Sequence, residues 1–195
     1  EYIIIDGGST DGTVDVIRKY ENKIAYMVSE PDEGIYDAMN KGIKVATGDI
    51  IGFMNSGDWY NNNCIALIVD AFLQYGSDLL YGDTTFIENG NWKRQDFSHI
   101  DWQRVFHGMP LCHQGMFVRT SLQKKYLFDT RYKLGADYKF LLQLYVLEKQ
   151  FKYIPYNLAF FSRDGVSMRC RWLALRESHN ISQEILRQAD HNFKS

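Results

Sequence analysis

The sequence has 195 residues, of which 45% are hydrophobic and 24% charged, and it includes 12 Phe, 13 Tyr and 4 Trp. This composition suits one folded domain with an ordinary core and excludes an intrinsically disordered chain. The formal net charge is −2, and there is no long run of Lys or Arg. The chain therefore has no general attraction for nucleic acid, and no nucleic-acid partner is expected.

Cysteine usage and hydropathy favour the cytoplasm. Cys64, Cys112 and Cys170 lie far apart and form no C-x-x-C pair, so we predict neither a disulfide framework nor a thiolate zinc site. No apolar run approaches the ~20 residues that span a bilayer, and no signal peptide precedes the first expected strand. These features predict a cytoplasmic chain without a membrane anchor of its own.

Residues 1–95 alternate between strand and helix patterns. A β-branched run ends in a Gly-Gly loop, and apolar residues at spacings of three and four later mark a helix that Gly48 ends. The expected elements are strands at 1–6, 25–29, 49–54 and 78–82, a short helix from Val14, helices at 34–47 and 65–75, and a hairpin turned at Asn89-Gly90. This βαβ alternation predicts an α/β fold with a mostly parallel sheet flanked by helices.

The second half of the chain is less regular. Residues beyond Asp96 are aromatic and irregular, which is typical of a functional segment. We expect a strand at 115–119, a helix at 138–148, two short strands around Pro155 within 151–162, and an amphipathic helix at 168–193. The single domain is thus divided into residues 1–95, 96–167 and 168–195.

Two aspartates end expected strands, where ligands bind in open α/β sheets. Asp6 precedes a Gly-Gly turn, from which its carboxylate can accept hydrogen bonds from a base or ribose. Asp58 ends the segment after the third strand, where a carboxylate can hold Mg²⁺ or Mn²⁺. The alternative for each is an ordinary turn or cap residue.

A third candidate group lies on the helix at 34–47. Asp37 and Asn40 are three residues apart, so they share a helix face that could look toward a nucleotide. A solvated face is the alternative, and the acids before this helix are explained by its dipole.

The ordered set of motifs resembles the nucleotide-binding half of family 2 glycosyltransferases. It consists of Asp6-Gly7-Gly8-Ser9-Thr10-Asp11-Gly12-Thr13, the segment Gly34 to Gly42, Ala46-Thr47-Gly48-Asp49 and Asn55-Ser56-Gly57-Asp58. The resemblance continues at Cys112-His113-Gln114-Gly115-Met116-Phe117 and Leu134-Gly135-Ala136-Asp137-Tyr138. The pattern is similar to the bacterial members that build surface polysaccharides.

This resemblance implies a GT-A fold and an inverting transfer of a sugar from a UDP- or GDP-linked donor to a hydroxyl of a glycan or lipid-linked acceptor. It implies Asp137 as the catalytic base, Asp58 as the ligand of Mg²⁺ or Mn²⁺, and His113 and Gln114 on the acceptor side. The residues expected to bind the nucleotide are Asp6, Gly8, Ser9, Asp37, Asn40 and Asn55. The alternatives are a backbone-bonded core histidine for His113 and an N-cap role for Asp137.

The sequence departs from the family pattern in three places. Family members begin with an earlier strand, so the sheet is expected to lack its first strand in this chain. Asp6-Gly7 stands where many relatives have two adjacent acids, and Asn55-Ser56-Gly57-Asp58 replaces Asp-x-Asp-Asp. Metal binding is therefore expected to depend on one carboxylate together with the diphosphate.

Two other functions remain open from the sequence. A catalytically inactive domain that binds glycan or nucleotide is compatible with the reduced acidic motif. A sugar nucleotidyltransferase is disfavoured, because the loop from Gly7 to Gly12 has no basic residue. For the helix at 168–193, the options are packing on the domain, pairing in a homodimer, or contact with the inner face of a membrane.

Overall fold

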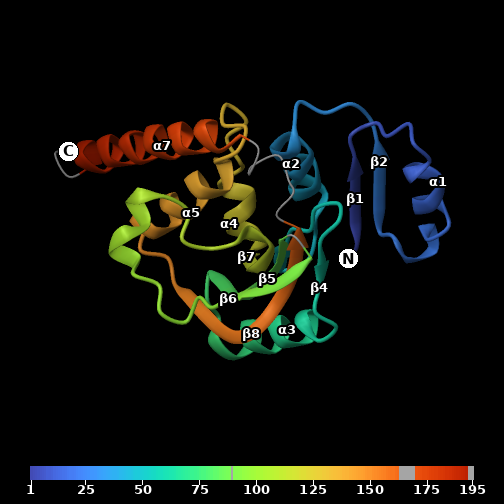
Figure 1. The fold of residues 1–195 in the computed structure, drawn as a ribbon, viewed down its shortest axis with the longest axis horizontal. Helices are drawn as coiled ribbons and strands as arrows, with labels where there is room; N and C mark the ends of the chain where they lie inside the picture. Colours follow the sequence, from blue (N-terminus) through green and yellow to red (C-terminus); the bar gives the residue numbers. More distant parts are fainter. Residues whose placement is uncertain (89, 163–169, 193–195) are drawn as a thin grey trace.

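The computed structural model describes residues 1–88, 90–162 and 170–192, with side chains described as far as residue 189. At the N-terminal end, β1 (Ile3–Asp6) and β2 (Tyr26–Ser29) form a parallel two-stranded sheet. The helix α1 (Thr13–Arg18) and the 3₁₀ helix η1 (Glu21–Lys23) connect the two strands, which makes a βαβ unit at one side of the molecule (Figure 1). The two strands expected here are confirmed.

The helix α2 (Ile35–Val45) connects this unit to the rest of the domain. Its apolar positions place Tyr36 and Ile43 in the hydrophobic core, while other residues of α2 contact β1 and α4. The predicted helix at 34–47 is therefore confirmed, and each end of α2 lies within two residues of the predicted end. The three-and-four spacing was sufficient because one face of this helix is buried.

A second, six-stranded sheet forms the centre of the molecule. It contains β3 (Ile50–Gly52), β4 (Trp59–Tyr60), β5 (Leu79–Glu88), β6 (Asn91–Gln95), β7 (Met116–Arg119) and β8 (Phe151–Ser162). The order is β3-β7-β5-β8-β4, and β6 pairs with β5. β5 and β8 are parallel, whereas β3–β7, β5–β7, β4–β8 and β5–β6 are antiparallel. The α/β class with flanking helices is confirmed, and this sheet is mixed.

The two short strands expected around Pro155 form one continuous strand, β8, so that prediction was wrong. The pairing with β5 moves from Gly82 with Ile154 to Asp83 with Asn157, which leaves Pro155 and Tyr156 outside the register. Proline has no N–H to donate to a neighbouring strand, so it is tolerated at such an irregularity. The strand therefore continues past Pro155 instead of ending there.

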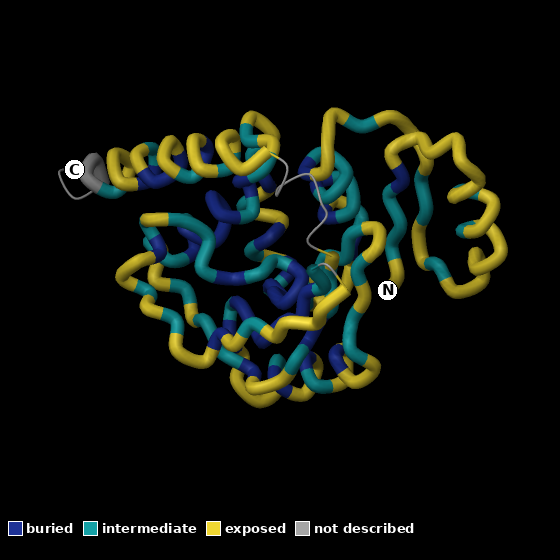
Figure 2. The backbone as a smooth tube through the Cα atoms, in the orientation of Figure 1, coloured by how far each residue is buried: buried dark blue, intermediate teal, exposed yellow. Residues whose placement is uncertain are grey.

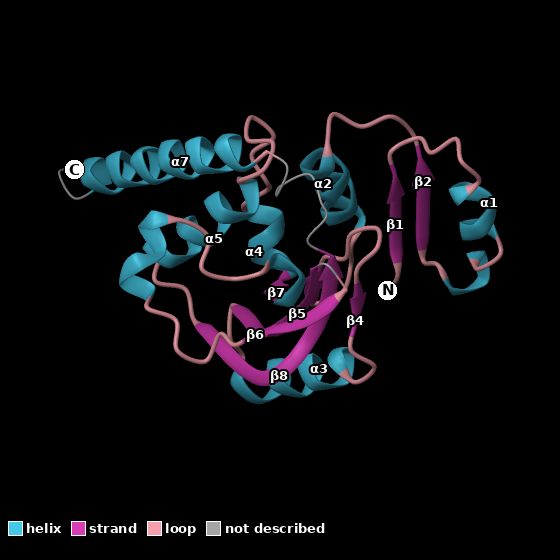
Figure 3. Cartoon of the chain, in the orientation of Figure 1, coloured by secondary structure: helices cyan, strands magenta, loops and turns pink. Residues whose placement is uncertain are grey.

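Helices cover both faces of the central sheet (Figure 3). On one face, α3 (Cys64–Tyr75) packs Cys64 and Ile68 against β5, β7 and β8, and it ends at Gly76 with a φ of 61°. On the other face lie α4 (Thr120–Lys125) and α5 (Ala136–Val146), whose Phe140 and Leu141 join the larger core. The buried residues gather between these layers, as Figure 2 shows.

The C-terminal helix α7 (Arg171–Asn192) lies along α5. Ile181 and Ile185 are buried against Tyr138 and Leu142, so packing on the domain accounts for one face of α7. The predicted start at Met168 and end at Phe193 lie outside the described residues. Within the described part of the chain, no helix is long and apolar enough to cross a membrane.

Candidate active site

The loop after β1 is organised around the carboxylate of Asp6. Asp6 is 8% exposed and accepts hydrogen bonds from the backbone of Gly8 (3.1 Å) and Ser9 (2.9 Å) and from the hydroxyls of Ser9 (2.5 Å) and Ser29 (2.6 Å). The hydroxyl of Ser29, then those donors from Ser9, lower the pKa of Asp6 to about 2. Asp6 therefore fixes the shape of this loop, in which Gly8 has a φ of 88°.

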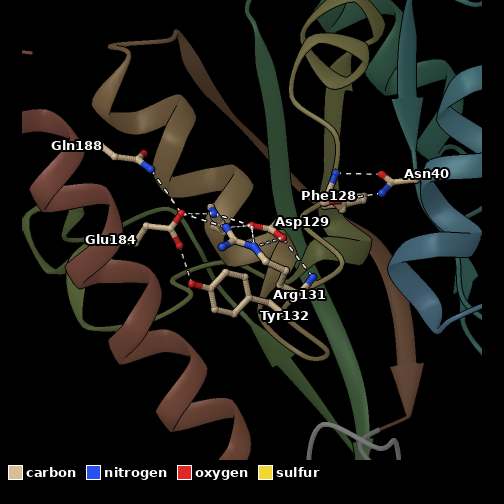
Figure 4. Close-up of polar contacts among 8 residues, drawn as sticks. Asn40, Phe128, Asp129, Arg131, Tyr132, Glu184 and Gln188 are labelled. Atoms are coloured by element: carbon tan, nitrogen blue, oxygen red, sulfur yellow. Dashed lines mark hydrogen bonds and ion pairs between the residues drawn. The ribbon is translucent and has the colours of Figure 1, made fainter.

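The two polar residues of α2 have different surroundings. Asp37 accepts a hydrogen bond from the backbone N–H of Glu33 at 3.2 Å and lies 3.5 Å from the Lys41 ammonium. Asn40 is 7% exposed, donates to the carbonyl of Phe128 at 2.8 Å, and accepts from the Phe128 N–H at 2.9 Å (Figure 4). Both ends of the Asn40 amide are thus bonded to the loop before α5, and the contact of Asn40 with the nucleotide stays a prediction.

Asp58 is held by the 3₁₀ helix η3 (His113–Gly115). Gln114 is 7% exposed and donates from Nε2 to Asp58 Oδ2 at 2.8 Å, while its Oε1 accepts from the Cys112 thiol at 2.7 Å. Burial raises the pKa of the Cys112 thiol to about 12, which keeps it protonated as a donor. Desolvation by burial also raises the pKa of Asp58, because its charge is removed from water.

The first residue of η3, His113, lies between Asn55 and Asp137. Its Nε2 is 3.1 Å from Asn55 Nδ2, and its Nδ1 is 3.6 Å from Asp137 Oδ2. Both ring nitrogens of His113 thus lie beside polar side chains. His113 therefore has side-chain partners, and the alternative of a backbone-bonded core histidine finds no support in these contacts.

Asp137 is the second residue of α5. The N-cap of that helix is Gly135, so the alternative that Asp137 is the capping residue is wrong. Oδ1 accepts hydrogen bonds from the Tyr36 hydroxyl and the Tyr138 N–H, both at 2.8 Å. The carboxylate therefore has one bonded oxygen and one that faces His113.

Five of the predicted site residues thus form one cluster from three distant segments: Asn55, Asp58, His113, Gln114 and Asp137. The described contacts do not join Asp6, Gly8, Ser9 and Asp37 to this cluster. Tyr36 was not predicted as a site residue, because an aromatic residue inside a helix pattern gives no sign of a polar partner 101 residues away.

The cluster has no preformed metal site of several ligands. Within the described residues, no group of three or more His, Cys, Asp or Glu could hold a metal ion. Asp58 nevertheless fits a hard cation, because it is a half-buried carboxylate that makes no ion pair with the described cationic side chains. Mg²⁺ is commonly held by one or two carboxylates together with substrate phosphates.

Two cavities lie in different relations to the cluster. A small void of about 10 Å³ lies behind it and is lined in part by His113, Asp137 and Phe128. A larger open hollow of about 450 Å³ lies over α7, lined by residues that include His179, Glu184 and Arg187, and it contains none of the predicted site residues. We place the site by its polar contacts.

The helix α7 supports the segment that leads into Asp137. Glu177 is 7% exposed and accepts hydrogen bonds from the backbone N–H groups of Lys133 (2.9 Å) and Leu134 (2.8 Å). Farther along α7, Glu184 bonds Tyr132 and Arg131, and with Asp129 it pairs the buried ammonium of Lys139 (Figure 4). Acids of α7 therefore hold residues 129–134 in place.

Comparisons with known proteins identify the family of this chain. The model of the family described as "Glycosyl transferase family 2" matches residues 1–135. A PGL/p-HBAD biosynthesis glycosyltransferase of Mycobacterium bovis is 31% identical over 153 residues, which are 74% of this chain and 58% of that protein. An uncharacterized glycosyltransferase of Mycobacterium tuberculosis is 46% identical over 147 residues, 73% of this chain and 56% of that protein. The chain spans little more than half the length of these relatives.

Solved structures share the fold. S. aureus TarS (residues 1–349) in complex with UDP-GlcNAc has a TM-score of 0.71 and 19% identity, covering 87% of this chain and 52% of that one. The mannosyltransferase PcManGT of Pyrobaculum calidifontis, in complex with GDP-Man and Mn²⁺, has a TM-score of 0.59 and 16% identity, covering 98% and 66%. The fold is thus the GT-A fold. With the family model matched over residues 1–135, the chain belongs to glycosyltransferase family 2.

Proposed function

We propose that this chain transfers a sugar from a nucleoside diphosphate donor to a hydroxyl of a glycan or lipid-linked acceptor, with inversion at the anomeric carbon. One observation carries the proposal. Asp58 is bonded to Gln114, and Asp137 lies beside His113, so consecutive residues of η3 connect the two carboxylates. We propose that these two carboxylates, Asp58 as the metal ligand and Asp137 as the catalytic base, border one reaction space.

Asp58 is proposed to hold Mg²⁺ or Mn²⁺. When bound, the cation neutralises the charge of the departing diphosphate. Burial of Asp58 supports this role, since a desolvated carboxylate gains from a nearby cation, and Gln114 fixes the direction of the Asp58 side chain through Oδ2.

Asp137 is proposed as the catalytic base. Its Oδ2 takes the proton of the acceptor hydroxyl while the hydroxyl oxygen bonds to the anomeric carbon and the carbon–diphosphate bond breaks on the opposite face. Tyr36 and the Tyr138 N–H hold Oδ1, so the side chain cannot rotate freely. His113 Nδ1 lies 3.6 Å from Oδ2.

The loop after β1 is proposed to receive the nucleotide. Asp6 gives this loop a fixed shape through its hydrogen bonds with Gly8 and Ser9, which are part of the loop. Asp37 lies in the first turn of α2. UDP and GDP are the nucleotides to test, since neighbours of the same fold were solved with UDP-GlcNAc and GDP-Man. A cytoplasmic location is part of the proposal and rests on three free cysteines, Cys64, Cys112 and Cys170.

The test is a panel of UDP- and GDP-sugars incubated with the chain and Mn²⁺, with release of UDP or GDP as the measurement. The proposal expects release from at least one donor. A chain that binds UDP or GDP but releases none from any donor, even with mixed oligosaccharide acceptors, would support the inactive binding domain instead.

The metal assignment has its own test. In Asp58→Asn, nucleotide binding should lose its dependence on Mn²⁺, because the carboxylate that holds the cation is gone. Gln114→Glu is a second test variant. It places another carboxylate beside Asp58 and should therefore strengthen Mn²⁺ binding. Unchanged metal dependence in Asp58→Asn would contradict the assignment.

A further inference from the structure

Three large aromatic rings form an open surface next to the proposed reaction space. Trp59 of β4 stacks on Phe160 of β8 with centroids 5.5 Å apart and an interplanar angle of 13°. Trp92 of β6 meets both rings edge-on, at 5.8 Å from Trp59 and 5.7 Å from Phe160. Trp59 is 42% exposed and Trp92 is 56% exposed. We call Trp59, Trp92 and Phe160 the aromatic platform.

The register of the sheet explains why these rings share one face. On β8, Phe160 is paired with Trp59 of β4 on one side and with Thr85 of β5 on the other. Trp92 of β6 is paired with Ile87, which lies two residues after Thr85 on β5. Directly paired residues lie on the same face of a sheet, and so do residues two apart. Tyr60, the next residue of β4, packs on Phe117 in the α3 layer. The platform therefore lies on the face opposite α3.

The platform is continuous with the metal-binding end of the proposed site. Trp59 directly follows Asp58 in the chain. The backbone of Ser162, two residues beyond Phe160 on β8, also forms a hydrogen bond with the Asp58 carboxylate. A molecule on the platform would thus reach the position where the donor diphosphate is proposed to bind.

The surroundings of the platform are polar. Arg94 lies two residues from Trp92 on the same face of β6, pairs with Asp83 at 2.6 Å, and has a side chain that is 56% exposed. Thr85, opposite Phe160, bonds Asn157 at 3.0 Å. Open aromatic faces with a polar rim suit a molecule that has both apolar C–H faces and hydroxyl groups.

We infer that the aromatic platform is a subsite for the acceptor glycan, on which pyranose rings stack by their C–H faces. This inference rests on the proposed function, because it assigns the second substrate of the same site. A single donor sugar would be enclosed between the diphosphate and Asp137, whereas three rings on an open face suit a chain of sugars.

The test is binding of the full chain to an array of mono- to tetrasaccharides, comparing native protein with Trp92→Ala. Loss of one stacking ring should weaken retention of the bound glycans about tenfold. Trp92→Phe should keep most of the binding, whereas Trp92→Leu, which keeps apolar bulk without a ring, should behave like Trp92→Ala. Trp172→Ala is the matched control, because Trp172 is 86% exposed on α7, away from the platform.

Binding of UDP or GDP with Mn²⁺ is measured on every variant and separates this inference from the proposed function. Nucleotide binding at the native level shows that Trp92→Ala is folded. If Trp92→Ala does not fold, Trp92→Leu replaces it in the comparison. The inference is overturned if the native chain retains no glycan, or if Trp92→Ala or Trp92→Leu retains glycans like the native chain. Failure of the native chain to bind any nucleotide would contradict the proposed function instead.

Discussion

At the scale of single residues, Asp137 is distinguished by the asymmetry of its contacts. Oδ1 accepts two hydrogen bonds at 2.8 Å, from Tyr36 and from the Tyr138 N–H. Oδ2 faces His113 at 3.6 Å, which is longer than a hydrogen bond. A carboxylate that is held by one oxygen can act with the other. The sequence could predict Asp137 from its motif, but not the tyrosine that holds it.

Tyr36→Phe tests whether that tyrosine positions the base. A hydrogen bond to a charged group contributes about 1.5–3 kcal/mol, so turnover should fall about tenfold to a hundredfold while the affinity for nucleotide stays native. The matched control is Tyr60→Phe, which also removes a half-buried hydroxyl, here one bonded to the Phe53 carbonyl at 3.1 Å. Equal kcat values for the two variants would contradict the positioning role.

Asp6 predicts a pH dependence of stability. Its folded pKa is about 2, below the ordinary value of about 3.9 that it regains on unfolding. Its contribution to stability is thus fully present above pH ~4 and is lost as the pH falls toward 2. In Asp6→Asn, Tm should be lower than native at pH 6, and the gap should narrow by pH 2.5. A gap that is constant with pH would show that the charge of Asp6 is unimportant.

At the scale of elements, the sequence predicted those whose signal is local. α2, α3 and α5 follow from apolar spacing, and the β5–β6 hairpin follows from its turn dipeptide, of which Asn89 lies outside the described residues. α4 and β4 were not predicted. A two-residue strand such as β4 is too short to show an alternating pattern and depends on its pairing with β8. The sequence TSLQKK of α4 has a single apolar residue, so it shows no apolar spacing.

The helix α7 was predicted as an amphipathic helix, but its relation to the base was not. Its buried face carries Glu177, which bonds two backbone N–H groups just before α5 begins. From the sequence alone, Glu177 is indistinguishable from a solvent-exposed acid, because its partners are the backbone N–H groups of residues 133–134, which are distant along the chain. Pairing with a second subunit and contact with a membrane stay untested predictions for the exposed face of α7.

Glu177→Gln tests this support. Glutamine offers one carbonyl oxygen in place of two carboxylate oxygens, so one of the two N–H groups loses its acceptor. We expect faster hydrogen exchange at Lys133 and Leu134 and a lower kcat, with an unchanged KM for the donor. Gln183→Glu, at an exposed position of the same helix, is the control for altered helix charge. Native exchange rates at both amides in Glu177→Gln would contradict the account.

At the scale of the whole molecule, the order of motifs along the chain predicted the family and the α/β class, and the comparisons confirm both. The division into residues 1–95, 96–167 and 168–195 stays a prediction. The proposed site crosses its first boundary, since Asp58 and Asn55 bond residues of η3. Such contacts join positions more than 50 residues apart, so they depend on how the sheet brings η3 beside the segment after β3.

Spacing along α2 was not sufficient to predict which of its polar side chains face a nucleotide. Asn40 shows why: its spacing from Asp37 puts it on a neighbouring turn of α2, yet its amide is bonded to Phe128. Spacing on a helix gives the face a residue shares, but not which neighbour that face meets. The same sequence pattern therefore fits a ligand contact and a scaffold contact equally well.

The central claim, that Asp137 is the base of an inverting sugar transfer, is tested most directly by the turnover of Asp137→Asn. The account predicts a fall in kcat of about two to four orders of magnitude, with native Tm and native donor binding, because asparagine keeps the shape but cannot accept the proton. Asp101→Asn is the control, since Asp101 caps η2 (Trp102–His107) and asparagine caps equally well. Near-native turnover in Asp137→Asn, with folding and donor binding intact, would contradict the claim.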